Sequence, residues 1–447
     1  EEIPVAFTTF MALGAWKLMR EGIIIKRSSV VETLGSTTVI CTDKTGTITE
    51  NSMRLKALFD YKSNQVFDEE RFNTPELSEL IEFAMWSSEP VPFDPMEKTL
   101  HQVYEQTQPN DQRKDFQMVH EYPLDGKPPM MTHLFESHSG ERIVAAKGAP
   151  EAILAVSSLS ENEKEILRRH ISDFGKQGYR ILGVAKCHFE GNNFPGKQQD
   201  FNFEFLGFTV FYDPPKKNIQ QVFRKIYDAG IKVKVITGDN ADTTNAIARQ
   251  AGIINHTPAV NGAEIIHHSE AELIELSKTT TLFTRMFPEA KLAMVNALKQ
   301  NGEVVAMLGD GVNDAPALKA AHIGVAMGSK GTEIAKAAAS LVITNDDLDK
   351  LITGIAAGRR IYANIKKAIQ YIISIHIPII LTVSLPLFLG WIYPHIFTPI
   401  HVIFLELIMG PTCSIVYENE PMEQDTMQRK PRKMTETFLN WKELSIS

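Results

Sequence analysis

Cysteine is scarce in this sequence of 447 residues, which contains only Cys41, Cys187 and Cys413. The three lie far apart along the chain and form no CxxC pair. We therefore expect neither a disulfide framework nor a cysteine-based zinc site, and a reducing, cytosolic environment suits most of the chain.

No signal peptide is visible in the sequence, and basic residues are not in excess. No positively charged segment precedes an apolar run at the start of the sequence, as a signal peptide would require. The formal net charge of −8 argues against a nucleic-acid partner. The chain begins with Glu1 instead of Met, inside an apolar segment, and we expect it to be a piece of a longer protein. Its length predicts two or three domains.

Long apolar runs near the C-terminus are limited to two. Residues 368–393 carry no formal charge and are long enough to cross a bilayer, whereas residues 400–416 form a shorter run with Glu406 in its middle. A short link at residues 393–395 would make the two runs a helical hairpin. Basic residues flank both outer ends of this hairpin, at Arg359, Arg360, Lys366, Lys367, Lys430, Arg432 and Lys433. Both ends are therefore predicted to face the cytosol; the alternative is a pair of buried core helices.

The chain before these runs has the pattern of a soluble α/β protein. Short apolar runs at residues 38–42, 233–236 and 304–308 end in glycine or aspartate signals, and helical segments such as 241–251 and 289–299 alternate with them. Continuous apolar strands predict a parallel sheet that is covered on both faces. A long stretch with its own strand and helix signals separates the first strand from the others, which predicts an inserted domain.

Asp43 directly follows the first of these strands, in the string DKTGTIT at residues 43–49. An aspartate at the carboxyl end of a parallel strand lies where open α/β sheets bind ligands, and its carboxylate can attack a phosphoryl group to form an acyl phosphate. The turn at Gly46 and Thr47 offers backbone N–H groups to phosphoryl oxygens. Asp-Lys alone would indicate no more than an aspartate-capped turn, but the whole seven-residue string is the phosphorylation signature of P-type ATPases.

The chain therefore resembles a type II, calcium-pump-like P-type ATPase of bacterial appearance. The resemblance implies an α/β, haloacid-dehalogenase-like, doubly wound phosphorylation domain with an inserted α+β nucleotide-binding domain, together with transmembrane α-helices. The implied divisions are the end of the fourth membrane helix (1–20), the first part of the phosphorylation domain (21–51), the nucleotide-binding domain (52–208), the second part of the phosphorylation domain (209–352), the fifth and sixth membrane helices (353–420) and a cytoplasmic tail (421–447).

Further motifs of the family follow the later strands, at residues 237–240 (TGDN), at Lys291 and at residues 309–318 (GDGVNDAPAL). In the family the threonine and glycine of the first motif hold the phosphoryl group and the lysine neutralises its charge. The two carboxylates and the amide of the last loop suit a hard cation such as Mg2+. The resemblance assigns catalytic roles to Asp43, Lys44, Thr45, Thr237, Gly238, Asp239, Lys291 and Asn313. It assigns Mg2+ binding to Asp43, Thr45, Asp310 and Asp314.

ATP is the nucleotide that the resemblance implies. Residues 147–151 (KGAPE) and 94–98 (DPMEK) resemble two nucleotide-binding elements of the family. The resemblance assigns ATP binding to Glu97, Lys147, Gly148, Arg180, Asp213 and Arg285. In one departure from the family, Leu124 stands where an aromatic residue stacks on adenine, and Pro129 replaces a lysine. Loss of a stack worth ~1–3 kcal/mol predicts weaker ATP binding; Phe93 and Phe135 are the nearby aromatic candidates.

The transported ion is less well indicated. Residues 1–4 (EEIP) resemble the proline-broken fourth membrane helix of the family, where Glu1 would be an ion ligand beside freed backbone carbonyls. In the later helices His376 falls on an expected asparagine and Glu406 on another, so a two-ion calcium cage is not reproduced. One site with Glu1 and Glu406 is expected, since buried membrane carboxylates are costly; His376 is either a third ligand or a packing residue. Ca2+ is the first candidate for the transported ion, and Mn2+ or a proton are the alternatives.

Two other functions compete with a pump. A soluble phosphatase of the haloacid dehalogenase superfamily would carry DxD at the nucleophile, but Thr45 stands at the second position, which favours a long-lived phosphoenzyme. The phosphatase also leaves residues 147–151 and the apolar runs without a role. A non-enzymatic membrane scaffold with a decayed ATPase domain is suggested by Leu124 and Pro129.

The expected setting is a multi-pass protein of the plasma membrane with its catalytic domains in the cytosol. Its expected partners are ATP, the transported cation and membrane lipid, without nucleic acid. The family's actuator domain and its remaining membrane helices lie outside this sequence. We therefore expect the chain to bind ATP and to be phosphorylated on Asp43, but not to complete a transport cycle.

Overall fold

The computed structural model describes residues 2–108, 110–126, 128–191, 193–256, 258–391 and 397–433. These residues form two compact units. Unit 1 contains the chain up to Ile48, Lys217–Asp239 and the chain from Ala251 onward, and unit 2 contains Thr49–Lys216 and Asn240–Gln250.

Unit 1 is built on an eight-stranded sheet with the order β1-β15-β14-β13-β2-β10-β12-β11. Its neighbouring strands are parallel except for β1, which pairs antiparallel with β15. The strands are β1 (Ile23–Ile25), β2 (Val39–Thr42), β10 (Lys232–Ile236), β11 (Ala259–Asn261), β12 (Leu282–Thr284), β13 (Val305–Gly309), β14 (Ile323–Met327) and β15 (Leu341–Ile343). The predicted parallel sheet is therefore confirmed, with β2 between β13 and β10.

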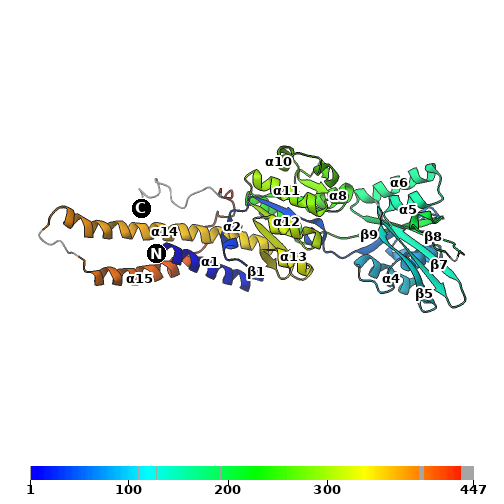
Figure 1. The fold of residues 1–447 in the computed structure, drawn as a ribbon, viewed down its shortest axis with the longest axis horizontal. Helices are drawn as coiled ribbons and strands as arrows, with labels where there is room; N and C mark the ends of the chain where they lie inside the picture. Colours follow the sequence, from blue (N-terminus) through cyan, green and yellow to red (C-terminus); the bar gives the residue numbers. More distant parts are fainter. Residues whose placement is uncertain are drawn as a thin grey trace. The chain divides into compact units, whose positions relative to one another are not determined.

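Helices cover both faces of this sheet, which explains why its strands are almost continuously apolar. On one face Cys41 and Met307 belong to the same buried cluster as Met294 and Leu298 of α11. Figure 1 shows α11 and α12 alongside these strands. On the other face α7 contacts β10 and α2 contacts β14. The helices of unit 1 are α1 (Glu2–Arg20), α2 (Ser29–Gly35), η1 (Lys44–Ile48), α7 (Ile219–Asp228), α9 (Gly262–Ile265), α10 (Glu270–Thr279), α11 (Pro288–Gln300), η6 (Val312–Asp314), α12 (Ala315–Ala320), α13 (Glu333–Ala338), α14 (Asp349–Phe388) and α15 (Pro399–Glu418).

Unit 2 is an antiparallel seven-stranded sheet with the order β4-β3-β9-β8-β7-β6-β5. Its strands are β3 (Arg54–Asp60), β4 (Gln65–Asp68), β5 (Phe116–Asp125), β6 (Met130–Ser137), β7 (Arg142–Gly148), β8 (Arg180–Cys187) and β9 (Glu204–Tyr212). Its helices are η2 (Glu69–Arg71), η3 (Pro75–Leu77), α3 (Ser78–Trp86), α4 (Pro95–Thr107), η4 (Gln112–Lys114), α5 (Pro150–Val156), α6 (Glu161–Lys176), η5 (Gln198–Asp200) and α8 (Ala241–Gln250).

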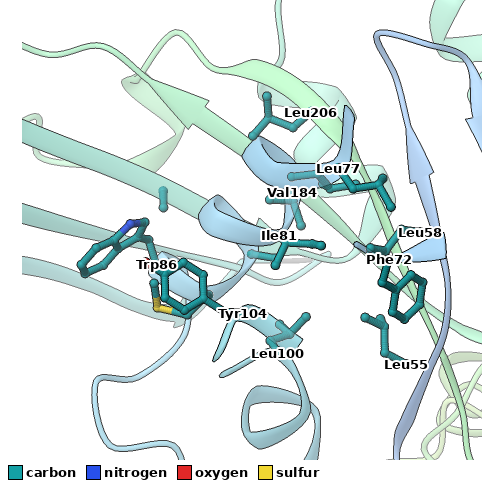
Figure 2. Close-up of a cluster of buried hydrophobic side chains, with 14 of the residues drawn as sticks. Leu55, Leu58, Phe72, Leu77, Ile81, Trp86, Leu100, Tyr104, Val184 and Leu206 are labelled. Atoms are coloured by element: carbon teal, nitrogen blue, oxygen red, sulfur yellow. The ribbon is translucent and has the colours of Figure 1, made fainter. Parts of the chain in front are cut away.

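An apolar core lies on each face of the sheet of unit 2. Figure 1 shows α4 covering one face and α5 and α6 covering the other. The first core lies under α3 and α4, where Trp86 and Tyr104 are each only 2% exposed. Figure 2 shows their rings beside each other, with Ile81 and Leu100 close by. The second core gathers apolar residues such as Ile153 and Phe208 beneath α5 and α6. Unit 2 therefore has a hydrophobic core of its own on each face of its sheet.

The apolar run predicted at residues 368–393 lies mostly within α14, a helix of 40 residues. Among the described residues, α14 is the one helix whose length and composition suit a membrane crossing. It begins well before the apolar run and ends at Phe388, because Gly390 adopts a positive φ of 61° that interrupts the helix. The second run lies in α15, which contacts α14. The predicted link at residues 393–395 lies outside the described residues.

Gly35 of α2 and Gly358 of α14 bring the backbones of these two helices into contact. A Cβ added to Gly358 would lie 2.4 Å from the carbonyl oxygen of Val31 and 2.6 Å from the backbone nitrogen of Gly35. One turn earlier on α14, a Cβ on Gly354 would meet only side-chain atoms of Leu34 and Ile23, at 3.6 and 3.7 Å. The two glycines of α14 therefore have different roles, since only Gly358 is required for the close approach.

We predict opposite effects for alanine at these two positions. Gly358→Ala should destabilise unit 1 by about 1–3 kcal/mol, because the added methyl group forces two backbones apart. Gly354→Ala should stabilise it by up to about 1 kcal/mol, because alanine favours the helix and its methyl group has room. Thermal unfolding of the two variants in detergent measures both effects, and equal melting temperatures would contradict the assigned contact.

Candidate active site

Three neighbouring strands of unit 1 end at the same edge of the sheet, each followed by a residue that the sequence singled out. Asp43 follows β2, Thr237 follows β10 and Asp310 follows β13. The strands are in register, because Thr42 of β2 pairs with Val235 on one side and with Leu308 on the other. This carboxyl edge is the place where open α/β sheets bind their ligands.

A buried lysine joins two of the carboxylates at this edge. Lys291 lies in the first turns of α11, and its Nζ is 2.5 Å from Oδ2 of Asp43 and 2.6 Å from Oδ1 of Asp314. Lys291 is 3% exposed and Asp314 is 1% exposed. Burial alone would lower the pKa of Lys291, but the two carboxylates raise it above its ordinary value. Lys291 is therefore a fixed positive charge beside the candidate nucleophile.

The groups around Asp43 shift its pKa in opposite directions. Burial raises the pKa of Asp43, Lys291 lowers it, and Asp314 and Asp239 raise it further, so that the net shift is upward. The carboxylate also accepts a hydrogen bond at Oδ1 from the backbone N–H of Lys44, at 2.6 Å. The charge of Asp43 is thus costly in this site unless cationic groups remain close to it.

Asp239 connects the loops that follow β2 and β10. Its Oδ2 lies 2.8 Å from Nζ of Lys44 and accepts hydrogen bonds from Oγ1 of Thr45 and Oγ1 of Thr237, both at 3.2 Å. Gly46 has a φ of 71°, which allows the chain to turn directly after Thr45. The structure therefore brings six of the predicted catalytic residues together, and Gly238 is exposed just after β10.

The loop after β13 is held by Asp314. Oδ2 of Asp314 accepts a hydrogen bond from the backbone N–H of Gly311 at 3.2 Å, and a Cβ on Gly309 would lie 2.5 Å from the Cβ of Asp314. Only glycine fits at that position. Burial, with Asp43 and Asp314 nearby, raises the pKa of Asp310 to about 7. Asn313 is exposed at the tip of this loop.

The predicted ATP residues Glu97 and Lys147 meet in unit 2. Nζ of Lys147 is 2.6 Å from Oε1 of Glu97 and donates to Oγ of Ser88 at 2.7 Å. Both charged side chains are buried, at 5% and 6% exposure. Gly148 follows on β7, where a Cβ would lie 2.6 Å from the Cα of Met130. Ser88 was missed by sequence reasoning, because a serine after a helix has no distinguishing signal.

The other predicted ATP residues are more dispersed. Arg180 is exposed at the start of β8. Asp213 is 5% exposed, and its carboxylate accepts hydrogen bonds from Oγ1 of Thr49 at 2.5 Å and from the N–H of Ser52 at 3.0 Å. Arg285 is exposed in unit 1, where its backbone N–H donates to the carbonyl of Asp239 at 2.8 Å.

The aromatic candidates for adenine stacking differ in exposure. Phe135 is 4% exposed and packs against Trp86, with 4.7 Å between ring centroids, so its ring belongs to the core. Phe93 is 78% exposed. Leu124, at the position where the family has an aromatic residue, is 63% exposed near the end of β5.

The predicted ion ligands are not assembled by the described residues. Glu1 lies outside the described residues, and Glu406 is exposed on α15. His376 lies within α14, where its Nδ1 is 2.7 Å from the carbonyl oxygen of Ile372 one turn earlier. His376 therefore has a hydrogen-bond partner in the backbone of its own helix.

Comparison with known proteins places these features in a family. Residues 37–322 match the haloacid dehalogenase-like hydrolases, and residues 394–446 match the C-terminus of cation-transporting ATPases. The calcium-transporting ATPase 1 of Bacillus cereus is 30% identical, over 98% of this chain and 51% of its own length. A calcium-transporting ATPase of Listeria monocytogenes is 33% identical, over 98% and 52%. The potassium-transporting ATPase alpha chain 1 of Xenopus laevis is 32% identical, over 97% and 49%.

The chain spans about half the length of the curated relatives that it matches. The matches confirm the resemblance seen in the motifs and the predicted fold class. They do not favour a soluble phosphatase, because the chain also matches the C-terminal region of cation-transporting ATPases. The chain belongs to the haloacid dehalogenase-like hydrolases and, among them, to the cation-transporting P-type ATPases.

Proposed function

We propose that this chain contains the catalytic part and some of the membrane region of an ATP-driven cation pump, in which Asp43 is phosphorylated. The observation that carries the proposal is the ion pair of 2.5 Å between Asp43 and the buried Lys291, at the sheet edge shared with Thr237 and Asp310. A non-enzymatic membrane scaffold with a decayed ATPase domain would have no need to bury these charges together.

The residues at this edge suit transfer of a phosphoryl group to a carboxylate. A carboxylate oxygen of Asp43 forms a bond to the terminal phosphorus of ATP while the bond from phosphorus to the ADP oxygen breaks. Lys291 and the hydroxyl of Thr237 offset charge on the transferring oxygens. Thr45 supplies no acid for rapid hydrolysis, because its hydroxyl is far less acidic than the carboxyl group of a second aspartate would be. The aspartyl phosphate is therefore expected to persist long enough to drive a transport step.

The carboxylates at the same edge fit Mg2+. Asp43 and Asp314 both contact Lys291, and burial together with these two acidic neighbours raises the pKa of Asp310 to about 7. Such oxygen-rich, electronegative surroundings suit a hard divalent cation. Asp43 and Asp310, with Thr45 and Asp314 beside them, would hold the ion, which supplies charge neutralisation between carboxylate and phosphate.

ATP would bind through Glu97, Lys147, Gly148, Arg180 and Asp213 of unit 2, and the family resemblance also assigns ATP binding to Arg285, which lies in unit 1. The exposed Leu124 offers no aromatic ring, which predicts weak adenine binding. The buried pair of Lys147 and Glu97 supports this placement, since a costly internal charge pair is common at functional sites.

The transported ion is proposed to be Ca2+ or a similar divalent cation. The relatives from Bacillus cereus and Listeria monocytogenes are named as calcium transporters. A proton or Mn2+ pump is the second candidate, because His376 and Glu406 occupy positions where the family places asparagines. The protein would lie in the plasma membrane as a multi-pass protein with its catalytic units in the cytosol. The actuator domain and the remaining membrane helices would be needed to complete the cycle.

Phosphorylation of Asp43 is the first test. Incubation of the chain with [γ-³²P]ATP and Mg2+ should give a label that is stable in acid and released by hydroxylamine, as an acyl phosphate is. Asp43→Asn should abolish this label, whereas Asp173→Asn, which removes an exposed carboxylate from α6, should leave it intact. Equal labelling of the wild type and Asp43→Asn would refute the assignment of the nucleophile.

The raised pKa of Asp310 predicts how stability depends on pH without metal. Between pH ~4 and ~7 the folded chain retains a proton on Asp310 that the unfolded chain has lost, so this group costs most stability at and above pH ~7. In EDTA at pH 8, Asp310→Asn should therefore stabilise unit 1 by about 1–3 kcal/mol, and the gain should shrink towards pH 5.

Melting temperatures with and without Mg2+ check this prediction. Mg2+ should raise the melting temperature of the wild type and have a much smaller effect on Asp310→Asn. The control Asp228→Asn, an exposed carboxylate on α7, should change stability equally at both pH values. A gain from Asp310→Asn that grows towards pH 5 would show that the sign is wrong.

The missing adenine stack predicts a gain of affinity. Leu124→Phe should tighten ATP binding about tenfold, as a base–aromatic stack contributes ~1–3 kcal/mol. Val119→Phe is the matched control, because Val119 is 45% exposed on the same strand but does not occupy the aromatic position of the family. Calorimetric titration with ATP distinguishes them, and an unchanged dissociation constant in Leu124→Phe would place the adenine elsewhere.

A further inference from the structure

Three side chains with metal-binding atoms gather in unit 2, apart from the phosphorylation site. One carboxylate oxygen of Glu89, one of Glu121 and a ring nitrogen of His133 all lie within 4.8 Å of one another. Glu121 of β5 and His133 of β6 are direct cross-strand partners, so their side chains leave the sheet on the same face. Glu89 follows Ser88, the residue that bonds His133.

His133 is prepared for a ligand at one ring nitrogen. Its side chain is fully buried, and its Nδ1 lies 3.1 Å from the carbonyl oxygen of Ser88. A carbonyl can only accept, so Nδ1 carries the hydrogen and Nε2 keeps its lone pair. Nε2 is buried and has no hydrogen-bond partner within the described part of the chain. A histidine whose outer N–H is fixed by a backbone carbonyl is the usual arrangement of a metal ligand.

The charges around the three side chains favour a cation. Burial raises the pKa of Glu89, and the neighbouring Glu121 and Glu97 raise it further, while Lys147 opposes them. Burial and then Lys147 lower the pKa of His133, which keeps its imidazole neutral near pH 7. Lys147 is already paired with Glu97 at 2.6 Å. Two carboxylates therefore repel each other beside a neutral imidazole, and a bound divalent ion would remove that repulsion.

We propose that Glu89, Glu121 and His133 form a binding site for a divalent transition-metal ion, Zn2+ or Mn2+. One imidazole nitrogen and two carboxylate oxygens are donors that both ions accept, whereas Mg2+ prefers oxygen ligands alone. Glu121 is exposed and Glu89 is half-buried, so both can rotate to bring their oxygens to bonding distance. Ser88 accepts from His133 through its carbonyl and from Lys147 through its hydroxyl, so the site adjoins the proposed ATP residues.

Zn2+ titration of the intact chain tests this site. The chain is stripped with EDTA, dialysed and titrated with ZnCl2 by calorimetry in excess Mg2+, which saturates the oxygen-only site at Asp43 and Asp310. The wild type should bind Zn2+ at a site that Glu89→Gln/Glu121→Gln loses or binds at least tenfold more weakly. The matched control Glu76→Gln/Glu165→Gln removes two exposed carboxylates from the same unit and should retain the site.

A second measurement keeps the proposal independent of folding. Mn2+ bound to the wild type should give an electron spin-echo modulation from a coordinated imidazole nitrogen, and Glu89→Gln/Glu121→Gln should lose it while keeping its metal-free melting temperature. Identical Zn2+ titrations of the wild type and Glu89→Gln/Glu121→Gln, or no nitrogen modulation in the wild type, would overturn the proposal. Phosphorylation of Asp43 is measured separately. Failure of the metal site would therefore not count against the proposed pump, and failure of the pump would not count against the metal site.

Discussion

The active edge of unit 1 depends on keeping three carboxylates close together in a largely buried place. Lys291 makes this possible, because one ammonium group contacts both Asp43 and Asp314. Removing a partner from such a cluster leaves an uncompensated buried charge, which is far more costly than losing a surface ion pair. The parallel order β13-β2-β10 brings the groups together, since it ends three loops at one edge. The fold brings the carboxylates together, and the charge of Lys291 allows them to remain close to the candidate nucleophile.

Much of this arrangement could be predicted from the sequence. The runs that became β2, β10 and β13 are mostly apolar, as expected for strands covered on both faces, although β10 includes Lys234, and each run is followed directly by a distinctive motif. Parallel strands must place such motifs at one edge. The roles of Asp43, Thr237 and Asp310 could thus be proposed from the sequence, whereas their exact partners could not.

Contacts between residues distant in sequence account for what the sequence did not reveal. The hydrogen bonds that join Thr45 and Thr237 to Asp239 depend on side-chain geometry, and no spacing rule encodes them. Ser88 and His133 carry no motif, and only the pairing of β5 with β6 brings His133 opposite Glu121. The apolar run at residues 368–393 alone also does not show where α14 begins, because most of the buried residues of α14 lie between Leu351 and Ile372, ahead of most of that run.

The central claim is that Asp43 itself accepts the phosphoryl group of ATP. Borohydride reduction of the ATP-treated chain converts an aspartyl phosphate into homoserine, which peptide mass spectrometry can locate along the sequence. The account predicts homoserine at position 43 in the presence of Mg2+ and none in its absence. Homoserine at another aspartate, or at no position in a chain that binds ATP and Mg2+, would contradict it.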